Sequence, residues 1–178
     1  MKDKKALLII DMLNDFVLEG ASLEVPATRT IIPNLKKEIQ NARKEGSPII
    51  FICDTHQHDD REFVKIGWPV HAVKGTTGSN VIEDLKPKDE DIFIEKPTFS
   101  AFYDTNLDEI LKDLKINTLR ITGTVTHICI LLAAAEGGVR GYDVEVPSDC
   151  VAGLDEDDEE FAFNLMQNVF GVKILNYK

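Results

Sequence analysis

The residues with the clearest potential for chemistry are a cysteine, an aspartate and a lysine that lie far apart in the sequence. Cys129 follows the apolar, β-branched run 118–122 and a Gly-Thr turn, where a run of small and aliphatic residues predicts a buried helix. In the first turn of a helix, unpaired N–H groups and the helix dipole favour a thiolate over a thiol. A lone cysteine is more often a small core residue, so the interpretation of Cys129 as a nucleophile depends on partner residues. Asp11 and Lys96 are the candidate partners.

Asp11 and Lys96 each end an apolar run, and each could act on a nearby thiol. A carboxylate beside Cys129 could take the proton of the thiol. The charge of Lys96 would favour the thiolate and the carboxylate together. Turn-forming aspartates and surface lysines are the commoner cases, so the prediction requires that the fold bring these residues together.

A second group of candidate residues lies in and just before the long polar stretch 55–80. Asp54 and His56 are two positions apart, which places both side chains on one side of an extended segment. His71 could join them, and Glu62 could be a further ligand, directly or through water. Two imidazoles and a carboxylate suit Zn²⁺ first, with Fe²⁺ or Mn²⁺ as alternatives, and leave positions open for water or substrate. Loop histidines without a ligand role are the other interpretation.

A parallel sheet would bring these candidates together, and the hydrophobic pattern predicts one. Six candidate strands alternate with helical patterns, at 6–10, 49–53, 91–95, 118–122, 142–146 and 172–175. This alternation indicates an α/β fold with a mostly parallel central sheet of about six strands and helices on both faces. Functional groups of such sheets lie at the carboxyl ends of the strands, where Asp11, Asp54 and Lys96 are found.

Three amphipathic patterns predict helices that cover the sheet. Residues 31–42 follow helical spacing up to a stop at Gly46, and residues 107–114 form a second pattern with Asp104 as the expected cap. The third helix opens on the acidic run 155–160, and its predicted apolar face consists of Phe161, Leu165, Met166 and Val169.

Length and composition limit the class of protein. The 178 residues predict one domain over 1–178, and the 43% hydrophobic content allows a sizeable core. The net charge of −11 argues against nucleic acid and anionic membranes as partners. An odd count of three cysteines and a charged start indicate a reducing, cytoplasmic setting. No apolar run reaches the ~20 residues needed to span a bilayer.

The segment around Cys129 resembles a known family. Gly123-Thr124-Val125-Thr126-His127-Ile128-Cys129 is similar to the nucleophile motif of the isochorismatase-like cysteine hydrolases. Asp11 and Lys96 match the other two members of that family's Asp–Lys–Cys triad. The resemblance covers essentially the whole chain. His127 and the run 136–138 depart from the usual pattern, but neither departure removes a triad residue.

The polar loop is similar to one branch of that family, the nicotinamidases (pyrazinamidases). The matching motifs are Asp54-x-His56, Trp68-Pro69-x-His71 and Gly75-Thr76-x-Gly78, with Ala72 as a departure. In that branch, the aspartate and both histidines hold a divalent metal. The resemblance also implies that Phe16 and Trp68 sandwich the ring of the substrate, with Phe99 or Tyr103 as a third wall.

The implied activity is a metal-assisted conversion of nicotinamide into nicotinate and ammonia through a cysteine thioester. The oxyanion would be met by the N–H groups of Val125 and Cys129. The family has a cis peptide at the position of Thr124–Val125, and both residues would contact the substrate. Two alternatives stay open: another small-amide, ureido or isochorismate-type hydrolase of the family, and a non-catalytic α/β module that binds a small ligand. The expected partners are a small-molecule amide and further copies of the chain in a homo-oligomer.

Overall fold

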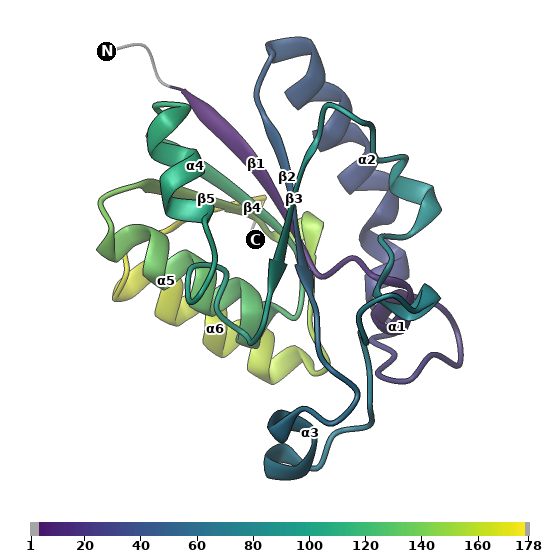
Figure 1. The fold of residues 1–178 in the computed structure, drawn as a ribbon. Helices are drawn as coiled ribbons and strands as arrows, with labels where there is room; N and C mark the ends of the chain where they lie inside the picture. Colours follow the sequence, from purple (N-terminus) through teal and green to yellow (C-terminus); the bar gives the residue numbers. More distant parts are fainter. Residues whose placement is uncertain (1–3, 177–178) are drawn as a thin grey trace.

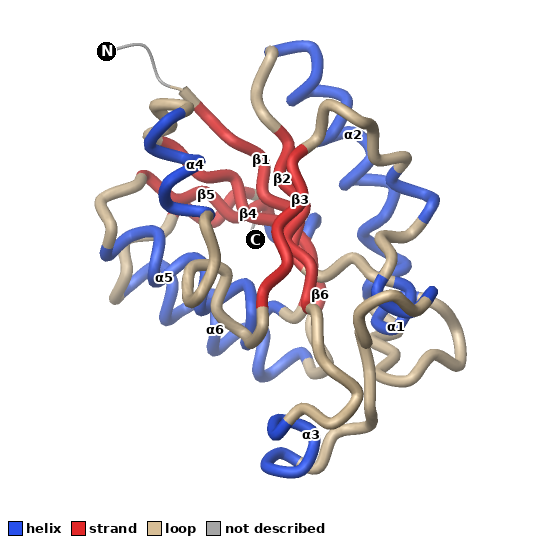
Figure 2. The backbone as a smooth tube through the Cα atoms, viewed as in Figure 1, coloured by secondary structure: helices blue, strands red, loops and turns tan. Residues whose placement is uncertain are grey.

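A parallel sheet of seven strands forms the middle layer of the structure (Figures 1 and 2). The computed structural model describes residues 4–176, and its strand order is β3-β2-β1-β4-β5-β7, with the short β6 paired to β4. The strands are β1 (Lys5–Ile10), β2 (Ile49–Asp54), β3 (Ile92–Lys96), β4 (Thr118–Thr124), β5 (Asp143–Pro147), β6 (Val151–Ala152) and β7 (Lys173–Leu175). The predicted parallel α/β fold is confirmed, and β6 is a strand that the hydrophobic pattern did not predict.

Helices cover both faces of this sheet (Figure 1). On one side lie α1 (Asn14–Val17) and α2 (Thr28–Glu45), and on the other lie α4 (Leu107–Asp113), α5 (Leu131–Val139) and α6 (Glu156–Asn168). The short helix α3 (Arg61–Ile66) projects beyond the carboxyl ends of the strands. A π-helical turn (Thr126–Ile130) joins β4 to α5, and single 3₁₀ turns lie at Thr77–Ser79, Glu83–Leu85 and Ser148–Cys150.

The central strand β1 shows why the hydrophobic runs are continuous rather than alternating. Successive side chains of a strand point to opposite faces. Leu8 and Ile10 pack in the core beneath α4, α5 and α6, whereas Leu7 and Ile9 pack in the core beneath α1 and α2. Both faces of β1 are therefore buried, as expected for a parallel sheet with helices on each side.

Gly123 marks the point where β4 passes closest to β1. A Cβ atom at this position would lie 2.0 Å from the carbonyl oxygen of Ile10, and the φ of +114° is one that other residues rarely adopt. Only glycine fits here. The close approach brings the end of β1 beside the segment that leads to Cys129.

Of two predicted helix ends, one is confirmed and one is wrong. α2 ends at Glu45, and the left-handed conformation of Gly46 at its C-cap (φ +69°) confirms the predicted stop. Asp104 is not the cap of α4, because the helix begins at Leu107 and Asn106 occupies the N-cap position. Asp104 instead has a left-handed φ of +53° in the turn that precedes the helix.

The predicted apolar face of α6 is partly wrong. Phe161 and Val169 are 63% and 64% exposed, whereas Ala162, Phe163 and Met166 are buried. Asp155 caps the helix by accepting hydrogen bonds from the N–H groups of Asp157 and Asp158 at 2.9 and 3.4 Å. The helix is apolar on more than one side, so its sequence alone does not determine which side faces the core.

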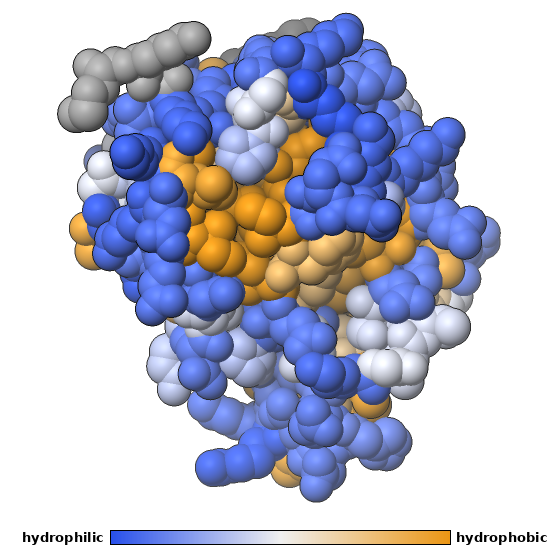
Figure 3. Space-filling view, turned by 45° about the horizontal axis from the view of Figure 1, so that its top comes forward, coloured by the Kyte–Doolittle hydropathy of each residue, from blue (hydrophilic) through white to orange (hydrophobic). Residues whose placement is uncertain are grey.

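The surface in Figure 3 is hydrophilic around its margin and hydrophobic near its centre. Within the described part of the chain, no helix combines the length and apolar character needed to cross a bilayer.

Candidate active site

Three adjacent strands place Asp11, Asp54 and Lys96 at one edge of the sheet. Asp11 follows β1, Asp54 ends β2 and Lys96 ends β3, in the order in which these strands pair. The N–H of Asp54 donates a 2.8 Å hydrogen bond to Oδ1 of Asp11. Asp11 has a left-handed φ of +54°, which turns the chain out of the sheet at this point. The predicted meeting of these residues is therefore seen in the fold.

Lys96 holds the two carboxylates together in a dry environment. Its ammonium lies 3.0 Å from Oδ2 of Asp11 and 3.0 Å from Oδ1 of Asp54, and its side chain is completely buried. It also donates to the carbonyl oxygen of Thr98 at 3.0 Å. These three oxygen atoms are the shortest contacts of the ammonium, and a fourth contact, to Cys129, is longer.

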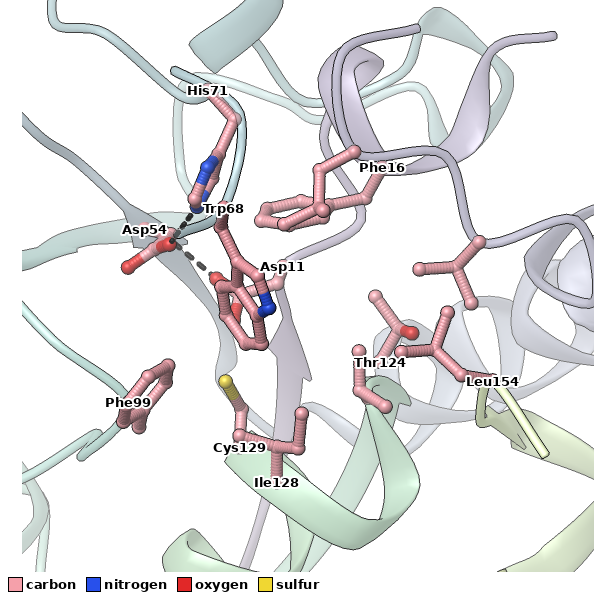
Figure 4. A pocket seen from close by; sticks show the side chains of 13 residues that line it. Asp11, Phe16, Asp54, Trp68, His71, Phe99, Thr124, Ile128, Cys129 and Leu154 are labelled. Atoms are coloured by element: carbon pink, nitrogen blue, oxygen red, sulfur yellow. Dashed lines mark hydrogen bonds and ion pairs between the residues drawn. The ribbon is translucent and has the colours of Figure 1, made fainter. Parts of the chain in front are cut away.

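Cys129 reaches the same cluster from the opposite side. It lies in the π-helical turn between β4 and α5, and its sulfur is 3.7 Å from Nζ of Lys96. Figure 4 shows the sulfur pointing into a cavity below Asp11. The peptide bond Thr124–Val125, just before this turn, is cis, as the family resemblance implied. The hydroxyl of Thr126 donates to Glu159 of α6 at 2.6 Å, which ties the turn to that helix.

Burial and charge divide the protonation states within the cluster. Burial raises the pKa of Asp11 to about 6, although the charge of Lys96 opposes this shift. Burial also disfavours ionisation of Asp54, but Lys96 and hydrogen bonds from His56 and His71 hold the pKa of Asp54 well below its usual range. Asp11 is thus the carboxyl group that can gain and lose a proton near neutral pH.

The charge of Lys96 favours the Cys129 thiolate, as expected, but it does not make the thiolate the resting state. Burial raises the pKa of the Cys129 thiol well above its ordinary value, and the attraction of Lys96 is insufficient to reverse this. The reason is that Lys96 is shared between two buried carboxylates, which repel a third negative charge. The resting pair is a Cys129 thiol beside an ionised Asp11.

Asp54 connects this cluster to a group of metal-ligating side chains. Its Oδ1 contacts Lys96, while its Oδ2 lies 2.9 Å from Nε2 of His56 and 3.5 Å from Nε2 of His71. All three donor side chains are buried. Burial disfavours a charged His56, but the hydrogen bond and charge of Asp54 outweigh it and raise the pKa of His56 to about 9.

The hydrogen bonds of the two imidazoles fit a cation between these donors. Nδ1 of His71 is 2.7 Å from the carbonyl oxygen of Pro69, which can only accept, so this nitrogen carries the proton. Nε2 of His71 therefore faces Oδ2 of Asp54 at 3.5 Å. A favourable contact between these two atoms needs a proton on Nε2 or a metal ion between them. Nδ1 of His56 is held in the same way by Oδ2 of Asp60 at 3.1 Å.

Glu62 is placed to one side of this set. Its carboxylate groups with His56 and Asp60, whereas Asp54, His56 and His71 form a separate group. Asp60 was not among the residues predicted from the sequence, although Asp is one of the residues preferred at the N-cap of a helix. Its Oδ1 accepts the N–H of Glu62 at 3.0 Å and caps α3, which leaves Oδ2 for His56.

The cavity beside Cys129 is walled by aromatic and aliphatic side chains (Figure 4). Its volume is about 60 Å³, which is room for a few water molecules. Of the predicted substrate contacts, the structure brings these to the cavity: Phe16, Trp68, Phe99, Thr124 and Val125. Tyr103 is 66% exposed and lines an outer hollow instead, so Phe99 is the wall. The lining residues that sequence reasoning missed are Leu23, Val25, Ile128 and Leu154.

A buried cysteine with an aspartate and a lysine, at the carboxyl edge of a parallel sheet, defines the class of protein as a cysteine hydrolase. The Isochorismatase domain model matches residues 5–175, which is nearly the entire chain. The protein belongs to the isochorismatase family of hydrolases.

Relatives within the family have different names and activities. The chain is 33% identical to the uncharacterized isochorismatase family protein YaaI of Bacillus subtilis, over 97% of this chain and 94% of that protein. It is 29% identical to the ureidoacrylate amidohydrolase RutB of Yersinia enterocolitica, over 93% of this chain and 83% of that protein. The pyrazinamidase of Pyrococcus horikoshii, solved in complex with zinc, superposes with a TM-score of 0.91 at 28% identity, covering 98% of this chain and 99% of that one.

Proposed function

We propose that this hydrolase converts nicotinamide into nicotinate and ammonia with the help of a bound divalent metal, zinc in the first instance. The observation that carries the proposal is that metal-ligating side chains and the Cys129 thiol open onto one apolar cavity. Asp54 and His71 line the same cavity as Cys129, and His56 stands behind them. The zinc complex of the Pyrococcus pyrazinamidase supports the same interpretation.

A pyridine carboxamide suits both ends of this cavity. The bound metal would take the ring nitrogen as a ligand and so anchor the ring. Phe16, Trp68 and Phe99 would contact the ring itself, since all three line the cavity. With the ring fixed at one end, the amide carbon would be held near the sulfur of Cys129 at the other.

The first half of the reaction forms a thioester. Asp11 takes the proton of the Cys129 thiol while the sulfur attacks the amide carbon, and the carbonyl electrons move onto oxygen. The N–H groups of Val125 and Cys129 receive this oxyanion. Asp11 then gives its proton to the amide nitrogen, the C–N bond breaks, and ammonia leaves.

The second half restores the enzyme. Asp11 takes a proton from water as the water oxygen attacks the thioester carbon. The C–S bond breaks, nicotinate is released, and the sulfur recovers the proton held by Asp11. Lys96 remains charged throughout and holds the carboxylate of Asp11 in place. The sum of both halves is amide plus water giving acid plus ammonia.

The charge of the cavity favours a neutral amide over an acidic substrate. Among the described residues that line it, Asp11 and Asp54 are acidic, and no lysine or arginine is present. Lys96 lies beneath the cavity, and its ammonium is already shared with Asp11, Asp54 and Thr98. A ureidoacrylate, which is an anion, would meet no cationic side chain in this lining, so its carboxylate would have to compete with Asp54 for the proposed metal.

Ammonia release from four compounds tests the proposal: nicotinamide, pyrazinamide, benzamide and ureidoacrylate. We expect the two nitrogen heterocycles to be hydrolysed, and benzamide, which lacks a ring nitrogen, to be at least about tenfold poorer in kcat/KM. His71→Ala should lower the metal content and raise the KM for nicotinamide. The matched control is His58→Ala, which removes an exposed histidine of the same loop. Equal rates for benzamide and nicotinamide, or full activity of H71A without metal, would overturn the proposal.

A further inference from the structure

The Gly75-Thr76-x-Gly78 motif has no role in the chemistry described so far, and Gly78 has an unusual neighbour. A Cβ atom at Gly78 would lie 2.1 Å from Oδ2 of Asp15 and 2.5 Å from its Oδ1. The carboxylate of Asp15 thus occupies the space that any other side chain at position 78 would need. In contrast, a Cβ at Gly75 would meet nothing within 4 Å, so only Gly78 is required for space.

The same carboxylate accepts a hydrogen bond next to a metal-ligating residue. Oδ2 of Asp15 receives the N–H of Ala72 at 2.8 Å. Ala72 follows His71, is completely buried and has a left-handed φ of +46°. A residue other than glycine in this conformation costs about 1 kcal/mol or more, so it requires a compensating contact. The hydrogen bond to Asp15 supplies that contact.

Further bonds join the segment that contains Asp15 to the loop that contains His71. The side-chain amide of Asn14 donates to the carbonyl oxygen of Thr77 at 2.7 Å. The backbone N–H of Asn14 donates to the carbonyl oxygen of Asn80 at 2.9 Å. The N–H of Ile82 donates to the carbonyl oxygen of Met12 at 3.0 Å. Figure 1 shows this loop running alongside α1.

Two residues of the same short segment as Asp15 have roles in the proposed reaction. Asp11, the proposed base, lies four residues before it, and Phe16, a wall of the cavity, is the next residue. The Phe16 and His71 rings are 5.4 Å apart. A single short segment therefore connects the base, one wall and a proposed metal ligand.

We propose that Asp15 is a positioning residue that, through Ala72 and the space left by Gly78, sets His71 against Phe16 and Asp54. This inference rests on the proposed function, because it assigns to Asp15 the orientation of a metal ligand and of the ring-binding wall. Asp15 itself does not touch the substrate or the metal.

Zinc affinity and the fluorescence of Trp68 measure this role in two independent ways. Trp68 is the single tryptophan of the chain, and its ring lies 6.1 Å from that of His71, so its emission reports on the loop without any metal or substrate. Asp15→Ala should weaken zinc binding about tenfold, as loss of an outer partner of a metal ligand does, and shift the emission of the folded protein to the red. It should raise the KM for nicotinamide more than it lowers kcat. Glu19→Ala, which removes an exposed acid two residues beyond α1, is the matched control.

A double variant separates a specific contact from general destabilisation. Gly78→Ala should act in the same direction as Asp15→Ala, because the new methyl group displaces the carboxylate. Once Asp15 is alanine, the atoms that the methyl would strike are gone, so D15A/G78A should be no worse than D15A alone. If D15A does not fold, Asp15→Asn should show the same shifts at smaller size, since a neutral acceptor binds more weakly.

The inference is overturned if D15A matches E19A in zinc affinity and emission, or if the effects of D15A and G78A add. The failure of the proposed function would look different. A wild-type protein that binds no zinc would contradict the metal site itself, whereas the emission of Trp68 would still test the link between Asp15 and the loop.

Discussion

Lys96 lies 3.7 Å from the sulfur of Cys129, yet the thiol of Cys129 has a raised pKa. Burial is the main cause of the raised pKa, and the charge of Lys96 does not offset it because the ammonium is shared with Asp11, Asp54 and Thr98 at 3.0 Å. A lysine that already neutralises a carboxylate lowers the pKa of a nearby thiol only weakly. Transfer of the thiol proton to Asp11 would release one N–H group of the ammonium toward the sulfur, so Lys96 can stabilise the thiolate when it forms rather than at rest.

The pH dependence of turnover should report on Asp11. Burial raises the pKa of Asp11 to about 6, and only the ionised carboxylate can accept the proton of Cys129. We therefore expect kcat/KM for nicotinamide to be constant above this pKa and to fall about tenfold per pH unit below it. The measurement is a pH profile between 4 and 8, with metal content determined at each pH.

Asp11→Asn is the companion to this profile. The amide cannot accept a proton, so turnover should fall at least about a thousandfold while the fold survives. A wild-type profile that bends near pH 4, where an unperturbed aspartate titrates, would contradict the assigned environment of Asp11.

Removal of Lys96 should affect stability as well as activity. Lys96→Met keeps the length of the side chain but removes the buried cation that lies 3.0 Å from both Asp11 and Asp54. Loss of one partner of a buried ion pair costs about 3–5 kcal/mol, which urea denaturation at neutral pH will measure. Lys74→Met is the matched control, because Lys74 pairs with Glu95 where both side chains are more than half exposed. That variant should lose less than about 1 kcal/mol, and equal losses in both variants would be contrary to the prediction.

The three cysteines should differ in their reaction with iodoacetamide. Burial raises the pKa of Cys53 and Cys150 to about 12. The thiol of Cys150 donates to Oδ1 of Asp149 at 3.8 Å, but neither cysteine lines the cavity that holds Cys129. Cys129 also has a raised pKa, but it lines the cavity and can pass its proton to Asp11. Mass spectrometry after brief treatment should show Cys129 modified first, with slow overall kinetics. An excess of nicotinate should protect it, and earlier labelling of Cys150 would argue against the proposed site.

The strand ends explain why much of the site could be predicted from the sequence. In a parallel sheet, every strand places its last residue at the same edge. Asp11 and Asp54 each follow an unbroken apolar run, and Lys96 follows the apolar residues 92–94 and Glu95, so their meeting needs only the fold class and the strand order. The parallel sheet therefore brings together residues that are 42 or more positions apart in the sequence, such as Asp54 and Lys96.

The sequence could not predict which side of α6 faces the core or how the charge of Lys96 is shared among its neighbours. α6 is apolar on more than one side, and packing against its neighbours decides that Phe163 is buried and Phe161 is exposed. Likewise, the pKa of Cys129 depends on how many carboxylates share Lys96, which is a matter of distances. Leu23 and Leu154 reach the cavity from loops whose course no local pattern predicts.

The last prediction concerns Asp60, whose two carboxylate oxygens serve different elements. Oδ1 caps α3 and Oδ2 holds Nδ1 of His56, so Asp60 fixes the ring that presents Nε2 to Asp54. Partners of this kind keep a ligating imidazole in one tautomer and orientation. Asp60→Ala should therefore weaken zinc binding about 10–100-fold, measured by competition with a chromophoric chelator, and raise the KM for nicotinamide.

The neighbouring Asp59 provides the control for this change. Asp59 is exposed and carries the same charge in the same turn, so Asp59→Ala removes one negative charge without removing a partner of His56. A long-range effect of charge on zinc would weaken binding similarly in both variants, whereas orientation of the imidazole would weaken it in D60A alone. Asp60→Asn separates the two functions of the side chain further, since its amide oxygen can still accept from one donor. Zinc affinity in D60A equal to that in D59A would show that His56 is held in place without Asp60.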